Sequence, residues 1–231
     1  MTDLLLSSTW FGFLLSTGTF FLAKAVNRRC GRERINPLLF ATVVCGLVII
    51  ISGMDYDVYY QGAQYLDVLL TPATICLAIP LYRQFELLKK NIPAVAAGCL
   101  AGVVAHMVGC ILMLVLFQLE AEEFITLLPK SITTAIGKGL SEELGGYASI
   151  TMATIMLTGI FGAVIAPPFL RLTGVKDPLA QGLAIGTSAH AAGTSRAVEM
   201  GEIQGAASSL AIVVTGLLTV IAAPILAHLA L

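Results

Sequence analysis

The sequence has little charge for its length. Lys, Arg, Asp and Glu make up 12% of the 231 residues, whereas about 25% is usual in a soluble domain. Hydrophobic residues make up 57%, and the mean hydropathy is +0.90. The net charge of −1 offers no basic surface for nucleic acid. The composition therefore predicts an all-α polytopic membrane protein and excludes nucleic acid as a partner.

The sequence also lacks the motifs of several kinds of chemistry. It contains no GxxxxGK[ST] loop for ATP, no HExxH motif and no Cys/His metal set. Its five cysteines include no CxxC pair, and most lie within apolar stretches, where they are interpreted as packing residues. We therefore expect a protein that is not an enzyme and that needs neither a cofactor nor a metal.

One sequence pattern occurs twice in the C-terminal half of the chain. Ser131 recurs as Ser188 and Glu142 as Glu199, in each case 57 positions later. Each copy is a stretch interrupted by Gly, Pro, Ser and Thr and followed by a long apolar stretch. Paired units with broken helices build binding sites inside the bilayer in transporters. We expect repeat units over about 128–170 and 185–227, with a weaker copy over 71–113.

Several apolar stretches are long enough to cross a bilayer, which takes about 20 residues. Two further stretches, 126–145 and 178–201, mix Gly, Ser, Thr and Ala with charged residues. Neither is typical of a helix that faces lipid. The expected membrane helices are 4–25, 36–53, 66–82, 92–118, 148–170 and 204–230.

The charges predict part of the topology. The loop 24–34 carries five basic residues and is expected in the cytoplasm, which puts the N-terminus outside. These charges follow the first apolar stretch rather than precede it, so we expect a retained helix and not a signal peptide. The acidic segment 54–67 is expected to be a loop on the outer side.

The mixed stretches leave two topologies open. If 126–145 crosses the membrane, Arg171 and Lys176 lie outside, against the positive-inside tendency; if it re-enters on one side, they lie inside. We favour re-entry. The two repeat copies are then inverted, with one broken hairpin from each side and their tips near the midplane, where irregular backbone must line a cavity or be buried in protein.

The stretch 182–211 predicts a site for a small anion. Hydroxyl groups can donate to a carboxylate, an arginine can bind it with two hydrogen bonds, and a half-helix N-terminus adds free N–H groups. The alternatives are that the small residues serve helix packing, that the histidine is structural, and that the arginine extends to the interface. The candidates are Thr187, Ser188, His190, Gly193, Thr194 and Arg196, with Glu199 as an additional one.

The first copy supplies matching candidates. A lysine inside a membrane is costly, and its default interpretation is functional. The alternative places Lys130 at the outer interface, in a weak surface pair with Glu123. The candidates are Lys130, Ser131, Thr133 and Thr134, with Asn36 and Thr74 as possible additional ones.

These residues carry a resemblance to the LrgB/CidB family of antiholin-like membrane proteins. Leu128-Pro129-Lys130-Ser131 and Asn36-Pro37-Leu38-Leu39 match its pattern, and the resemblance extends over nearly the whole chain, which implies a single LrgB-like transmembrane domain, 1–231. The most specific run contains Gly186-Thr187-Ser188, His190, Gly193-Thr194, Arg196 and Glu199, then Glu202, Gly205-Ala206 and Ser208-Ser209.

The resemblance implies competing functions. Bacterial members are described as modulating murein hydrolase export, beside a small LrgA/CidA-type membrane partner. Plastid relatives exchange glycolate and glycerate, and some bacterial pairs are linked to pyruvate uptake. We expect a secondary transporter of small monocarboxylates, with His190 as a carrier of the coupling proton.

The alternatives are an antiholin-like modulator of cell lysis, or a scaffold subunit whose partner transports. The expected location is the bacterial inner membrane, in a homo- or hetero-oligomer.

Overall fold

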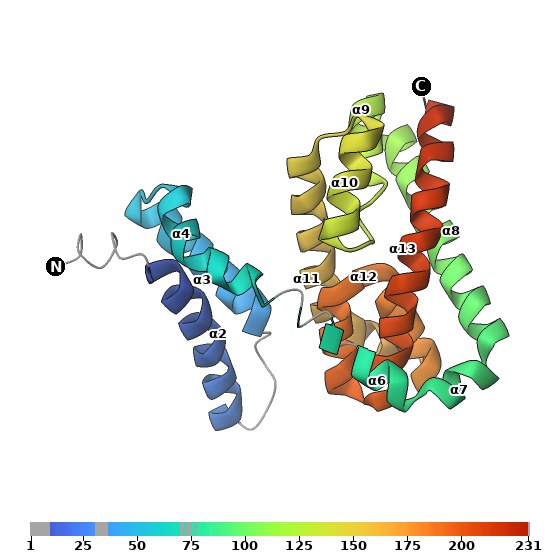
Figure 1. The fold of residues 1–231 in the computed structure, drawn as a ribbon, viewed down its shortest axis with the longest axis horizontal. Helices are drawn as coiled ribbons and strands as arrows, with labels where there is room; N and C mark the ends of the chain where they lie inside the picture. The colour runs from blue at the N-terminus through green and yellow to red at the C-terminus, as the bar shows by residue number, and fades with distance from the viewer. Residues whose placement is uncertain (1–9, 31–36, 70–71, 73–74, 77, 231) are drawn as a thin grey trace. The chain divides into compact units, whose positions relative to one another are not determined.

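The computed structural model describes residues 10–30, 37–69, 72, 75–76 and 78–230, and the secondary structure of these residues is helical. The chain divides into two compact units, 1–76 and 77–231. The first unit contains α2 (Phe11–Cys30), α3 (Pro37–Ser52) and α4 (Tyr56–Asp67) (Figure 1). The all-helical fold class expected from the sequence is thus confirmed.

In the first unit, α2 packs against both α3 and α4. Gly12 lets α2 approach α4 closely, because a Cβ at this position would overlap the carbonyl of Tyr59. One turn further on, the Ser16 hydroxyl is 2.7 Å from the Tyr59 hydroxyl. The expectation of a plain loop over 54–67 is wrong: Asp55 caps a helix there, and its carboxylate accepts a hydrogen bond from the Asp57 amide.

The expected membrane helix over 66–82 is also wrong. Helix α4 ends at Asp67 and a turn follows at Val68-Leu69. Further along, the second unit begins with two short helices, α6 (Ala78–Arg83) and α7 (Phe85–Lys90). The turn at Val68-Leu69 falls within an apolar stretch, and an average over that stretch does not reveal it, so the sequence suggested one continuous helix.

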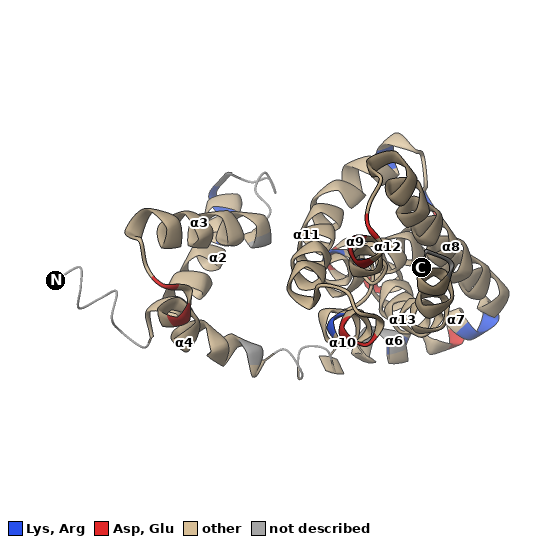
Figure 2. Cartoon of the chain, turned by 90° about the horizontal axis from the view of Figure 1, so that it is seen from above, with Lys and Arg blue, Asp and Glu red and all other residues tan. Residues whose placement is uncertain are grey.

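Three long helices form the frame of the second unit: α8 (Ile92–Phe117), α11 (Ala148–Leu172) and α13 (Glu202–Ala230). Each is long and apolar enough to cross a membrane. Their shafts are free of Lys, Arg, Asp and Glu, which lie at or near the helix ends (Figure 2). The second unit therefore has the build of a multi-pass membrane protein, as expected for 92–118, 148–170 and 204–230.

The first mixed stretch folds as a hairpin of two short helices. These are α9 (Ala121–Leu127) and α10 (Thr134–Leu144), joined by the segment 128–133. Tyr147, which follows α10, bonds back to α9: its amide donates to the Thr126 hydroxyl at 2.8 Å, and its hydroxyl donates to the carboxylate of Glu122, in the first turn of α9, at 2.6 Å. Entry and exit therefore lie at one end of the bundle, as Figure 1 shows.

The second mixed stretch is α12 (Pro178–Met200), which breaks at His190 with φ 41° and ψ −138°. Its two halves also start and finish at one end. The Gln204 amide, at the start of α13, donates to the Gln181 side chain near the start of α12 at 3.1 Å. Figure 1 places this hairpin at the end of the bundle opposite α9 and α10.

The 57-residue offset of the sequence repeat reappears in the helices. Helix α9 begins at 121 and α12 at 178, which is 121 plus 57. Thr133, the N-cap of α10, corresponds to His190, where the second half of α12 begins. Each hairpin is followed by a long helix, and α11 and α13 run in opposite directions (Figure 1). The second unit thus contains an inverted repeat with two broken segments, whereas the repeat's outer limits stay a prediction.

Candidate functional site

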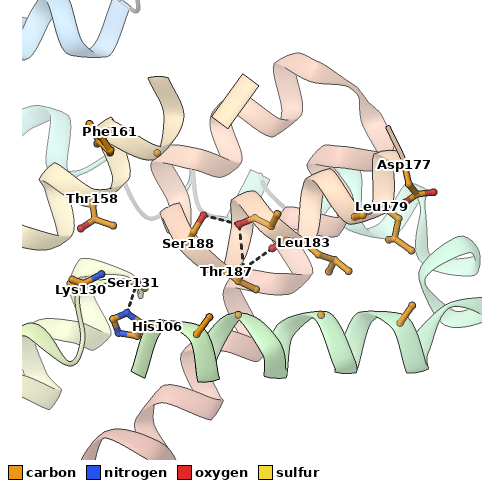
Figure 3. Close-up of a pocket in the computed structure, with 17 residues that line it drawn as sticks. His106, Lys130, Ser131, Thr158, Phe161, Asp177, Leu179, Leu183, Thr187 and Ser188 are labelled. Atoms are coloured by element: carbon orange, nitrogen blue, oxygen red, sulfur yellow. Dashed lines mark hydrogen bonds between the residues drawn. The ribbon is translucent and has the colours of Figure 1, made fainter. Parts of the chain in front are cut away.

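A cavity of about 880 Å³ lies in the second unit, between α8, α11, α12 and the segment 128–133. This volume is large enough for a small organic molecule together with water. Glycine and alanine form much of the wall. The polar or charged side chains that line it are His106, Lys130, Ser131, Thr158, Asp177, Thr187 and Ser188 (Figure 3).

Glycines set the distance between α8 and α12 at this cavity. A Cβ on Gly102 would lie 2.6 Å from the Thr187 Cβ, and one on Gly98 would lie 3.1 Å from Leu183 Cδ1. These two glycines are four residues apart, so they share one face of α8. On its other side, α12 uses Gly182 and Gly186 to pack on α13. The small residues here serve packing, which is the alternative that the sequence left open.

Lys130 enters the cavity from the tip of the first hairpin. Its neighbours Leu128 and Ile132 are buried and hold the tip in place. Its own side chain is half-buried and lies beside His106 and Ser131 (Figure 3). Among the described residues, Lys130 forms no ion pair. A cation in an intramembrane cavity without an acidic partner is a strong candidate for binding an anion.

His106 connects α8 to the same hairpin tip. Its Nε2 is 2.7 Å from the Leu128 carbonyl, and its Nδ1 is 3.2 Å from the Ser131 hydroxyl. A carbonyl only accepts, so Nε2 carries the hydrogen and, in the neutral ring, Nδ1 accepts from Ser131. His106 therefore fixes the position of both Leu128 and Ser131 at the edge of the cavity.

The hydroxyls of α12 are engaged within their own helix. Thr187 donates to the Leu183 carbonyl at 2.9 Å, and Ser188 donates to the Ala184 carbonyl at 2.7 Å. Asp177 lies at the other end of the cavity in Figure 3, where it caps α12 by accepting from the Ala180 amide at 2.8 Å. The positive charge of Lys130 and the negative charge of Asp177 therefore lie at opposite ends of the cavity.

The structure brings four of the residues predicted from sequence into this cavity: Lys130, Ser131, Thr187 and Ser188. Thr133 and Thr134 lie outside its lining, where they cap and begin α10. The two additional candidates, Asn36 and Thr74, lie outside the described residues.

His190 and Thr194 hold the second hairpin together and do not line the cavity. His190 is buried at the kink, and its Nε2 donates to the Ile155 carbonyl of α11 at 2.8 Å. Its ring lies against Gly159, where a Cβ would come within 2.5 Å of Cε1. The Thr194 hydroxyl bonds to the His190 carbonyl and to the Ser208 hydroxyl.

The remaining predicted residues also lie away from the cavity lining. Gly193 packs against Ala189 and Ile185. Arg196 donates to the Glu199 carboxylate at 2.8 Å, near the end of α12. Any part that these residues take in binding stays a prediction.

Three polar or charged side chains that line the cavity were not among the predicted residues: His106, Thr158 and Asp177. His106 could have been found, because an ionisable side chain inside a 26-residue apolar helix is a signal in itself. For Thr158, the sequence offers no signal beyond its position within the first repeat unit, 128–170. Asp177 looks like an ordinary helix cap, which it also is.

Two opposed hairpins packed among three long apolar helices define the class: a multi-pass helical membrane protein. The chain belongs to the LrgB-like family, whose family model matches residues 16–229. It is 32% identical to the holin-like protein CidB of Staphylococcus epidermidis, over 92% of this chain and 93% of that protein. It is 33% identical to the holin-like protein CidB of Staphylococcus aureus, with the same coverage. No solved structure matches the chain.

The contact between Gly159 and His190 gives the first testable prediction. The change Gly159→Ala places a methyl group into the His190 ring, and we expect the free energy of unfolding to fall by about 1–3 kcal/mol. The matched control is Gly139→Ala on α10, where nothing lies within 4 Å. The control should raise the free energy of unfolding by about 0.5–1 kcal/mol. Reversible denaturation in detergent measures both, and equal effects would contradict this packing.

Proposed function

We propose that the chain carries small monocarboxylates across the membrane through the cavity at Lys130. The observation that carries the proposal is a lysine at a hairpin tip, in a cavity between two inverted hairpins, without an ion pair among the described residues. The family resemblance suggests pyruvate, glycolate or glycerate as substrates. We place the protein in a bacterial inner membrane, with the N-terminus outside because the segment 24–34, which includes the end of α2, is basic.

The side chains of the cavity suit a compact acid. The Lys130 ammonium neutralises the carboxylate, and Ser131 lies next to it on the same tip. The cavity volume of about 880 Å³ leaves room beside the carboxylate for a short carbon chain and water. In carriers built from inverted repeats, one repeat moves against the other around a fixed site, which opens the site to each side in turn.

Removal of the Lys130 charge tests this proposal. The change Lys130→Met should lower the uptake of labelled pyruvate or glycolate into proteoliposomes at least about tenfold, because the carboxylate loses its cation. Lys130→Arg should keep part of the uptake.

The matched control is Lys138→Met on the same hairpin. Lys138 is exposed, and its Nζ is 3.8 Å from the Glu142 carboxylate. The control should transport like the unchanged protein. The proposal is wrong if Lys130→Met also does so, or if no two- or three-carbon acid is taken up with or without the partner.

A second function is antiholin-like modulation of murein hydrolase export and cell lysis. The relatives that the chain resembles over more than nine-tenths of its length are named holin-like proteins. Their names support this function more directly than they support transport. It would act through association with a small LrgA/CidA-like membrane partner, in a homo- or hetero-oligomer. We expect no enzymatic activity in either case.

Lysis assays separate the two functions. If lysis control depends on partner contacts alone, Lys130→Met should lose pyruvate uptake and keep its effect on lysis. If lysis control follows transport, both should fall together. Autolysis rates of cells that carry Lys130→Met or the control Lys138→Met, with the partner co-expressed, measure this. Loss of lysis control in Lys130→Met with normal protein levels contradicts an antiholin role that is independent of the cavity.

A further inference from the structure

The hydrogen bonds of His106 give its two ring nitrogens different tasks. Nε2 is committed to the Leu128 carbonyl at 2.7 Å. Nδ1 faces the Ser131 hydroxyl at 3.2 Å. In the neutral ring, Nδ1 is an acceptor, so the Ser131 proton points to the ring and Ser131 offers only lone pairs to the cavity. An anion gains no hydrogen bond from Ser131 in this state.

One proton on Nδ1 reverses this arrangement. The protonated ring donates through Nδ1 to the Ser131 oxygen, and the Ser131 proton is released to donate elsewhere. Ser131 lines the cavity next to Lys130 (Figure 3), so the free hydroxyl can donate to a carboxylate held there. Protonation of His106 thus converts Ser131 from an acceptor into a donor for the anion.

Electrostatic interaction also couples the protonation of His106 to the binding of the anion. Lys130 is close enough to His106 for their charges to interact. Two positive charges side by side repel each other, and a carboxylate bound between them removes that repulsion. An anion therefore favours the proton on His106, and by reciprocity the proton favours the anion.

Few other groups face the His106 ring. Cys110, one turn along α8, has its sulfur 3.8 Å away. The side chains that α11 and α12 contribute near the ring in Figure 3, Thr158, Thr187 and Ser188, do not titrate in this range. Of the acidic residues described, Asp177 alone lines the cavity, at the opposite end. Among the described residues that line the cavity, Lys130 is therefore the one charged side chain beside the His106 ring. A bound anion offsets the positive charge of Lys130.

We propose that His106, with Ser131 as its relay, is the proton-binding site that couples one proton to each monocarboxylate. This inference rests on the proposed transport function. It replaces His190 as the coupling residue, because His190 is buried at the hairpin kink and does not line the cavity. The proton adds to Nδ1 when the anion enters and leaves again when the anion departs, so the ring returns to its neutral form.

The test measures pyruvate uptake into proteoliposomes under a pH gradient, with the membrane potential clamped. A dye trapped inside the proteoliposomes reports the lumenal pH. The unchanged protein should accumulate pyruvate against its gradient when the outside is acidic, with acidification of the lumen. His106→Gln retains a hydrogen-bonding amide but takes up no proton. It should lose at least about nine-tenths of the accumulation and the acidification of the lumen, and, with Lys130 intact, it should still exchange labelled for unlabelled pyruvate when pyruvate is in excess. The control His228→Gln, on an exposed histidine of α13, should behave like the unchanged protein.

A second variant covers the case in which His106→Gln does not fold. Ser131→Ala should raise the KM for pyruvate about tenfold at acidic pH, where the hydroxyl is a donor, and change it little at alkaline pH. If the unchanged protein takes up no pyruvate, the transport function and this inference fail together. If it takes up pyruvate and His106→Gln or Ser131→Ala keeps the normal pH dependence, the inference alone is overturned.

Discussion

The structure depends on how irregular backbone is anchored inside a membrane. A hairpin tip exposes carbonyl groups that no water reaches in the bilayer core, and each unsatisfied group costs several kcal/mol. A histidine anchors each tip, although only the first of them satisfies a carbonyl of the tip itself. His106 of α8 donates to the Leu128 carbonyl at the first tip, and His190 at the second tip donates to the Ile155 carbonyl of α11. The two bonds fix both tips to spanning helices, and the cavity lies beside them.

Close helix packing is the second constraint, and the glycines of the sequence serve it. Gly102 on α8, Gly159 on α11 and Gly186 on α12 each face a neighbouring helix at a distance that a Cβ would not permit. Small contact residues let membrane helices approach where the hydrophobic effect provides no driving force. Gly98 and Gly102 of α8 take part in this packing against α12 and also line the cavity.

Much of this architecture could be predicted from the sequence. Length and hydropathy gave the three long helices, because both properties are local. The 57-residue repeat, together with the charges of Arg171 and Lys176, gave two hairpins from opposite ends. The prediction over 66–82 was wrong because the turn at Val68-Leu69 falls within an apolar stretch, and an average over that stretch does not reveal it.

The lining of the cavity could not be predicted in full. The kink at His190 turns the second half of α12, so Thr187 lines the cavity while Thr194 bonds to Ser208 on α13. Residues that look equivalent in the sequence therefore face different neighbours. His106 stands between apolar residues and belongs to no motif, so only the cost of a histidine in such a helix could have revealed it.

The central claim is that each hairpin enters and leaves on one side, from opposite sides of the membrane. A membrane-impermeant thiol reagent tests it on single cysteines placed in a cysteine-free chain at Glu120, Glu143, Lys176 and Glu199, all exposed. The account predicts that Glu120→Cys and Glu143→Cys react from one side, and that Lys176→Cys and Glu199→Cys react from the other. If Glu120→Cys and Glu143→Cys react from opposite sides, the first hairpin crosses the membrane and the account is contradicted.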